Sequence, residues 1–107
     1  MVISIVTRKT SVRDRDQWQS RLEGALPRIT EVLKAQPGFV GLRYLWGTEG
    51  DGLMGQITRW ETLDDCLRYV REGAAATVAM HEDRAIPTAS YPDGSWVRQT
   101  FEVVEAG

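Results

Sequence analysis

Two alternating stretches joined by a glycine-rich turn constrain the fold of this chain most. The stretches are Phe39–Trp46 and Leu53–Trp60, and the residues between them read GTEGDG. Alternating side chains predict strands, and a short glycine-rich connection predicts that the two strands pair as an antiparallel hairpin. The second strand runs directly into ETLDD, where Thr62, with Asp65 three residues later, is typical of a helix start. One face of that strand should therefore lie under the helix that follows it.

The remaining elements flank this hairpin. We expect a first strand at 2–8 and a helix that begins near Asp14 and ends at the QPG of residues 36–38. We also expect a kink or break near residues 23–24, because Pro27 lacks a backbone donor. After the hairpin we expect two helices and a last strand, at 62–73, 74–84 and 96–104. This order, β-α-β-β-α-(α)-β, predicts an α+β fold of the ferredoxin-like kind, an antiparallel sheet with helices on one face.

Helices on one face leave the other face of the sheet open. The strand at 39–46 is largely apolar on both sides, with Val40, Leu42, Tyr44 and Trp46 on one and Phe39, Gly41 and Leu45 on the other. We expect Val40, Leu42, Tyr44 and Trp46, or else the residues that alternate with them, on the open face. A broad apolar surface of this kind marks a partner surface. Burying several hundred Å² of it would contribute a gross gain of roughly 10 kcal/mol, so we expect a homodimer packed sheet to sheet.

The bulk composition excludes several classes of protein. A length of 107 residues predicts one domain, spanning 1–107. The net charge of −2 argues against nucleic acid as a partner, since that role needs a basic patch. The apolar run at the N-terminus is too short for a membrane span or a signal peptide. With the single cysteine Cys66, these features indicate a cytoplasmic protein, and 11 arginines against two lysines suggest a GC-rich bacterial genome.

Familiar catalytic and binding motifs are missing from the sequence. It holds no Cys/His cluster for zinc and no glycine-rich phosphate loop, and His81 is its one histidine. Two pairs of adjacent carboxylates occur, Asp64–Asp65 and Glu82–Asp83. Neighbours on a helix point in different directions, so we expect both pairs to be solvated helix surface rather than a paired acid and base.

The segment QPGFVGLRYLWGTEGDGLMGQITRWETLDDCLRYV resembles the antibiotic biosynthesis monooxygenase family. The residues that carry the resemblance are Pro37–Phe39 and Arg59–Thr62, together with the order of elements over nearly the whole chain. The resemblance implies a dimeric α+β barrel in which each subunit keeps a pocket between its sheet and its helices. Several members of that family oxidise small polycyclic phenols to quinones with molecular oxygen and no metal or flavin. Others act on quinols, and one branch binds and degrades haem.

The resemblance also implies site residues. In the quinone-forming members a strand Trp and an amide side chain four residues before it face the pocket. The matching positions here are Trp60 and Gln56, although the family residue at the second position is Asn. Those enzymes also have a pocket Tyr and a pocket Arg, for which Tyr69 and Arg84 are the nearest candidates in this chain.

Alternation along the third strand puts Met54, Gln56, Thr58 and Trp60 on one face, which we expect to look into the pocket. A reaction without cofactors needs the substrate as electron donor, in its phenolate form. We expect Trp60 to line the pocket and Gln56 and Arg84 to bind substrate oxygens, with Met54 and Thr58 beside them. Tyr69 or His81 would assist proton transfer. No cofactor and no metal is expected.

Each of these residues also has a plain structural explanation. Trp60 would serve as a large core residue under the helices, and Gln56 and Thr58 would satisfy each other or a helix end. Tyr69 would lie on the outer face of its helix, and His81 would face solvent.

Two rival functions remain open at this point. One is a small-molecule binder or structural dimer that keeps the fold without the chemistry. The other is haem binding or degradation. In the haem-degrading relatives an Asn near the first strand and a helix His after the Trp are needed. This chain has no asparagine, and His81 lies 21 residues after Trp60.

Overall fold

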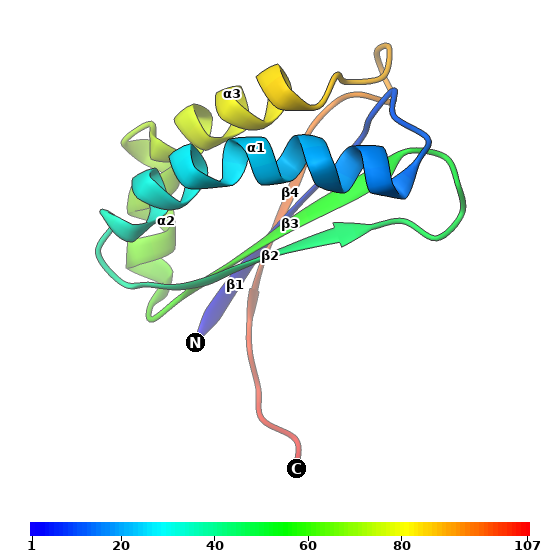
Figure 1. Ribbon diagram of the computed structural model, residues 1–107. Coiled ribbons are helices and arrows are strands. Elements are labelled where there is room, and N and C mark those ends of the chain that lie inside the picture. The colour runs from blue at the N-terminus through cyan, green and yellow to red at the C-terminus, as the bar shows by residue number, and fades with distance from the viewer.

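The computed structural model describes residues 1–107 as a four-stranded antiparallel sheet with three helices on one face (Figure 1). The strands lie side by side in the order β2-β3-β1-β4. The elements are β1 (Val2–Lys9), α1 (Arg15–Lys34), β2 (Phe39–Trp46), β3 (Leu53–Trp60), α2 (Leu63–Arg71), α3 (Ala74–Ala85) and β4 (Val97–Glu102). The α+β, ferredoxin-like fold expected from the sequence is confirmed.

Side-chain caps start the first two helices where the sequence predicts. Asp14 Oδ1 accepts hydrogen bonds from the backbone N–H groups of Asp16, at 2.8 Å, and Gln17, at 3.4 Å. The hydroxyl of Thr62 accepts from the N–H of Asp65 at 3.1 Å and donates to its carboxylate at 2.9 Å. Each cap satisfies N–H groups that the first turn of a helix leaves without a partner.

The break expected near residues 23–24 does not occur, because α1 is continuous across Pro27. Proline removes one hydrogen bond of the helix, the one that would reach the carbonyl of Glu23. Both Pro27 and Glu23 lie on the exposed side of α1, so the unpaired carbonyl is not confined to the protein interior. The buried side of the helix, which includes Ile29 and Leu33 at 0% exposure, holds the element against the sheet.

A β-bulge at the start of β2 decides which face its side chains take. Pairing with β3 shifts by one residue between Phe39 and Gly41. Beyond the shift, Tyr44 lies opposite Gln56 and Trp46 stacks on Trp18 of α1, with ring centroids 5.0 Å apart. Leu42, Tyr44 and Trp46 therefore do not occupy the open face, since they lie under the helices, and the alternate residues of the strand take that place.

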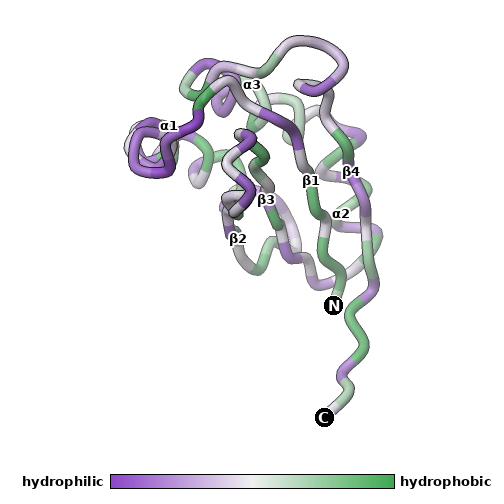
Figure 2. The backbone as a smooth tube through the Cα atoms, turned by 90° about the vertical axis from the view of Figure 1, so that its right-hand side faces the viewer, coloured by the Kyte–Doolittle hydropathy of each residue, from purple (hydrophilic) through white to green (hydrophobic).

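The open face of the sheet remains largely apolar, although other residues supply it. Alternation and register give it these apolar side chains: Ile3, Ile5, Leu45, Leu53, Ile57, Val97 and Phe101. The same register also places polar and charged side chains there: Thr7, Lys9, Arg43, Arg59 and Gln99. Val97 is 53% exposed and Phe101 is 45% exposed. Figure 2 shows hydrophobic stretches along β1 and β4.

Two buried clusters join the sheet to the helices. The larger contains Val2, Ala25, Ile29, Leu33, Trp60, Cys66, Tyr69, Ala75 and Val78. The smaller contains Val12, Trp18, Leu22, Met54 and Ile86. None of the three helices combines the length and the apolar character that crossing a bilayer requires.

Candidate functional site

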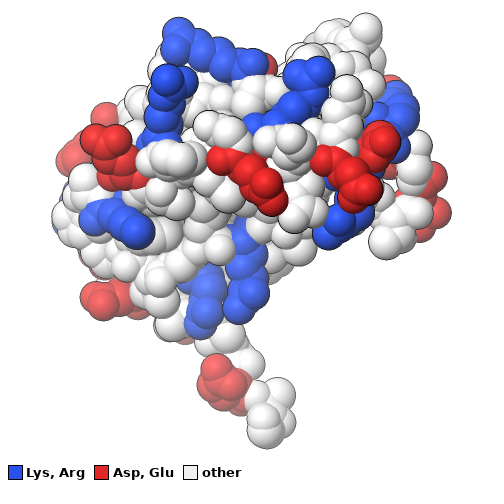
Figure 3. Space-filling model, in the orientation of Figure 1, with Lys and Arg blue, Asp and Glu red and all other residues white.

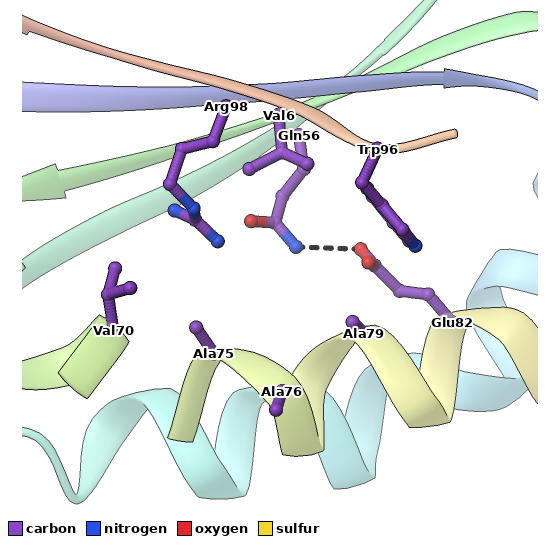
Figure 4. Close-up of a pocket in the computed structure, with 9 residues that line it drawn as sticks. All are labelled: Val6, Gln56, Val70, Ala75, Ala76, Ala79, Glu82, Trp96 and Arg98. Carbon is purple, nitrogen blue, oxygen red and sulfur yellow. Dashed lines mark hydrogen bonds between the residues drawn. The ribbon is translucent and has the colours of Figure 1, made fainter. Parts of the chain in front are cut away.

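A cavity of about 230 Å³ lies between the helix-covered face of the sheet and α3 (Figure 4). Its apolar walls are formed by Val6, Val70, Ala75, Ala76, Ala79 and Trp96. Three of these six residues are alanines of α3, and their short side chains leave the space between helix and sheet. Three polar side chains complete the lining, namely Gln56, Glu82 and Arg98. An apolar chamber with a few convergent polar groups is the usual composition of a small-molecule site.

Glu82 is the centre of a buried hydrogen-bond network. Its side chain is 0% exposed, and its Oε2 accepts a hydrogen bond of 2.7 Å from Gln56 Nε2 and another from the hydroxyl of Tyr44. The second carboxylate oxygen, Oε1, is buried without a protein partner, and so is Gln56 Oε1. Burial raises the pKa of Glu82, while the two hydrogen bonds act in the opposite direction. Two acceptor atoms are therefore left without donors in the protein.

Arg8 brings a buried positive charge to one end of this network. It is 2% exposed, donates to the carbonyl of Ile86 at 3.2 Å and lies 3.4 Å from the carboxylate of Asp83. Its guanidinium carbon sits 4.7 Å from the ring centre of Trp96. Burial lowers the pKa of Arg8, and the charges of Asp83 and Glu82 oppose that shift. This cation offsets part of the cost of placing Glu82 in the interior.

Arg98 of β4 reaches the cavity on the side away from Trp96. Its guanidinium donates to the hydroxyl of Ser4 at 2.6 Å and lies 6.0 Å from the ring centre of Tyr69. Figure 4 shows Gln56 between Arg98 and Glu82, with its amide nitrogen toward Glu82. The polar part of the cavity thus has a carboxylate on one side and a guanidinium on the other.

Trp60, Thr58 and Met54 share the helix-facing side of β3 with Gln56, as expected, but none of them lines the cavity. Trp60 is fully buried, and its indole N–H donates to Thr58 Oγ1 at 2.9 Å. Its ring meets Phe39 edge to face at 5.7 Å between centroids. Met54 belongs to the smaller core cluster, with Trp18.

The structure does not bring His81 and Arg84 to Gln56. Both line a separate hollow of about 230 Å³ between α1 and α3, together with Arg21 and Arg28. Successive residues of a helix rotate by about 100°, so Glu82 faces the sheet while residues 81 and 84 face α1 or solvent. Figure 3 shows Lys and Arg side chains gathering over α1 and α3 on this side of the molecule.

Tyr69 is buried and lies on the inner face of α2. Cys66 and Tyr69 point inward, whereas Leu63 and Val70 are 49% and 38% exposed. The Tyr69 ring packs on Trp60 with centroids 4.7 Å apart, and its buried hydroxyl has no protein partner. The plain explanation that put Tyr69 on the outer face is wrong. Tyr69 lies beside the cavity without lining it.

Sequence reasoning missed Glu82, Tyr44, Arg8, Trp96 and Arg98. The expectation that Glu82 is solvated is wrong, and a signal for it exists in the sequence. Ala75, Val78, Ala79 and Glu82 recur at helical spacing, so the glutamate continues the inner stripe of α3. No comparable signal marks Tyr44, because its face depends on the bulge in β2.

No group of three or more His, Cys, Asp or Glu side chains is arranged so that it could hold a metal ion. The polar groups of the cavity are instead an amide, a carboxylate and a guanidinium. This set suits hydrogen bonding and proton transfer with an organic ligand.

No protein-family model matches the sequence, and no curated protein matches it. Solved structures do match. SnoaB of Streptomyces nogalater, described as a cofactor-independent oxygenase, has a TM-score of 0.61 and 19% identity over 98% of this chain and 95% of its own. The ActVA-Orf6 monooxygenase of Streptomyces coelicolor, in complex with nanaomycin D, has a TM-score of 0.65 and 17% identity over 98% of this chain and 88% of its own. The heme-degrader MhuD of Mycobacterium tuberculosis, with two hemes bound, has a TM-score of 0.63 and 19% identity over the whole of both chains.

Proposed function

We propose that this protein, whose fold is that of the antibiotic biosynthesis monooxygenases, oxidises a small aromatic phenol or quinol with molecular oxygen, without metal or flavin. The observation that supports this most is the cavity under α3. Its walls are apolar, and its polar groups, Gln56, Glu82 and Arg98, converge on one region. A flat aromatic ring suits such walls, and a ring oxygen suits the polar groups. Its volume of about 230 Å³ favours a small substrate.

The reaction can be written without an added reductant. A phenol gives up the hydrogen of its hydroxyl and the hydrogen of one ring C–H bond, and both leave with one atom of O2 as water. The other oxygen atom joins that ring carbon, and the product is a quinone. The substrate supplies all the electrons, so the protein's task is to favour the electron-rich phenolate. In the proposal the guanidinium of Arg98 stabilises its negative charge, together with the N–H of the Gln56 amide that is not bonded to Glu82.

The remaining expected residues have supporting places in the proposal. Trp60, Thr58 and Met54 are buried on the same strand and the same face as Gln56, and the ring of Tyr69 packs on Trp60. We assign to them the positioning of Gln56 rather than contact with substrate, because none of them lines the cavity.

Oxygen uptake by the purified protein tests the proposal, using a panel of hydroxynaphthalenes, hydroxyanthracenes and quinols. We expect uptake, and for the phenols a quinone absorbance, that survive treatment with a chelator. Gln56→Leu should lower the rate, whereas Arg84→Gln, in the separate hollow, should keep it. No uptake with any member of the panel would refute the proposal. Binding of a phenol without uptake would favour the non-catalytic binder, and a Soret band on titration with hemin would favour the haem alternative.

We also propose that two copies pair through the open face of the sheet. The support is the row of apolar side chains on that face, with Leu45 at 44% and Phe101 at 45% exposure. A surface of this kind is costly to leave in water and contributes stability when it is buried between subunits. We expect the protein in the cytoplasm, consistent with its single, buried cysteine, Cys66.

A further inference from the structure

We propose that Glu82 is the base of the cavity and that its free oxygen, Oε1, takes the hydroxyl proton of the phenolic substrate. This inference rests on the proposed function for the class of ligand. The inference goes beyond the proposed function because it assigns a catalytic role to Glu82, a residue expected from the sequence to lie on the solvated surface. In the step, the O–H bond of the phenol breaks, a new O–H bond forms on Glu82, and the phenolate keeps the electron pair.

The first argument is the geometry of the carboxylate. Glu82 Oε2 is held by two donors, Tyr44 from β2 and Gln56 from β3, which fix the plane and direction of the group. Oε1 is buried, belongs to a residue that lines the cavity, and has no protein partner. A buried acceptor without a donor destabilises the folded protein. The hydroxyl of a phenol seated in the cavity supplies the donor that this oxygen lacks.

The second argument is elimination among the neighbouring groups. Of the residues that line the cavity, only Glu82 can accept a proton at ordinary pH, because Gln56 is an amide and Arg98 is already charged. The hydroxyl of Tyr44 donates a hydrogen bond to Glu82 Oε2, which makes Tyr44 a positioning residue. The neighbouring carboxylate of Asp83 points away, with 42% of its side chain exposed and Arg8 as its partner.

The third argument concerns charge before and after transfer. The titratable and charged groups around Glu82 are Arg8 of β1, Tyr44 of β2, Tyr69 of α2, Asp83 of α3 and Arg98 of β4. Burial favours the neutral carboxylic acid, so a buried carboxylate is a stronger base than one in water. Once the proton has moved, the negative charge rests on the substrate.

Arg98 lies on the far side of Gln56 from Glu82. Its guanidinium is placed to stabilise the phenolate once the proton has left.

The test measures the ionisation state of a bound phenol directly. Para-nitrophenol absorbs in the visible range as its phenolate and not as the neutral phenol. With the wild-type protein in mildly acidic buffer, we expect a phenolate band on binding, and therefore an ionisation midpoint shifted to lower pH than in free solution. Glu82→Gln keeps the size of the side chain and cannot take the proton. It should bind the phenol with affinity within about threefold and lose the band, while Asp64→Asn, on the exposed surface of α2, keeps it.

Turnover supplies a second readout. Where the wild type consumes oxygen, Glu82→Gln should lower kcat by about a hundredfold or more, as is typical for loss of a general base, and change KM little. A Glu82→Gln protein that keeps both the phenolate band and kcat overturns the inference. The inference is also overturned if the wild-type protein fails to bind the phenol or leaves the ionisation midpoint of the phenol unshifted. This second outcome needs only the wild type, so it can be read even if Glu82→Gln does not fold. A shifted midpoint without oxygen uptake refutes the proposed function and not the role of Glu82.

Discussion

Replacing Tyr69 with Phe should stabilise the protein, although it removes a polar group from the interior. The side chain is 1% exposed, and its hydroxyl has no hydrogen-bond partner in the protein. Burial raises the pKa of this phenol, so the group is neutral at ordinary pH and no charge is lost with it. The ring itself, packed against Trp60 with centroids 4.7 Å apart, is retained in Phe.

The magnitude follows from the cost of an unpaired hydroxyl. Mutational data put that cost at about 1–3 kcal/mol. Loss of the packing made by the oxygen atom offsets part of this gain, because a small void forfeits close contacts. We therefore expect a net stabilisation of about 1 kcal/mol for Tyr69→Phe. For a domain near this size, that corresponds to a rise in Tm of roughly 4 °C.

Tyr44→Phe is the matched control, since it makes the same chemical change nearby with the opposite expected sign. The Tyr44 hydroxyl donates to the buried carboxylate of Glu82, and a hydrogen bond to a charged group is worth about 1.5–3 kcal/mol. We expect Tyr44→Phe to lower Tm while Tyr69→Phe raises it, in thermal denaturation followed by circular dichroism. A Tyr69→Phe protein that is less stable than the wild type would refute the reasoning, because its hydroxyl would then have to be hydrogen-bonded in the folded state.

Three further predictions concern the open face, a turn and the pH dependence of stability. Ile57→Asp places a charge on the open face and should give a monomer by light scattering where the wild type gives a dimer; a wild-type monomer would remove the proposed interface. Gly52→Ala should destabilise by about 1–3 kcal/mol, since φ is +80° and a Cβ would overlap the carbonyl oxygen of Thr10; an unchanged urea midpoint would contradict this. The pKa of Glu82 is raised in the folded state, so protonation of Glu82 stabilises the folded wild type. The free energy of unfolding of the wild type, relative to that of Glu82→Gln, should therefore be highest below about pH 4.3, the pKa of an unfolded Glu, and should fall as the pH rises through the folded pKa. A difference in Tm between the two proteins that does not vary with pH would show that the pKa is not raised.

The sequence by itself determined the helices and strands that depend on interactions between residues close together in the chain. Alternation predicts Leu53–Trp60 as a strand with Gln56 and Trp60 on one side, and the structure shows that arrangement. Asp14 and Thr62 begin helices because a short polar side chain reaches N–H groups only two or three residues away. Both partners of each of these interactions lie within a few residues of one another, so the sequence alone is enough to identify them.

Tertiary structure alone decided which of these residues form the cavity. The face taken by Tyr44 depends on a one-residue shift in pairing between β2 and β3, and a shift of one residue reverses every later side chain of a strand. The rotation of α3 about its own axis depends on its packing against the sheet and α1. That rotation buries Glu82 and turns His81 and Arg84 away, although all three lie within one turn of helix. Both choices are made by contacts between segments far apart in the chain. Local sequence patterns carry no signal for the first, and for the second they carry only the helical spacing of Glu82 with Ala75, Val78 and Ala79.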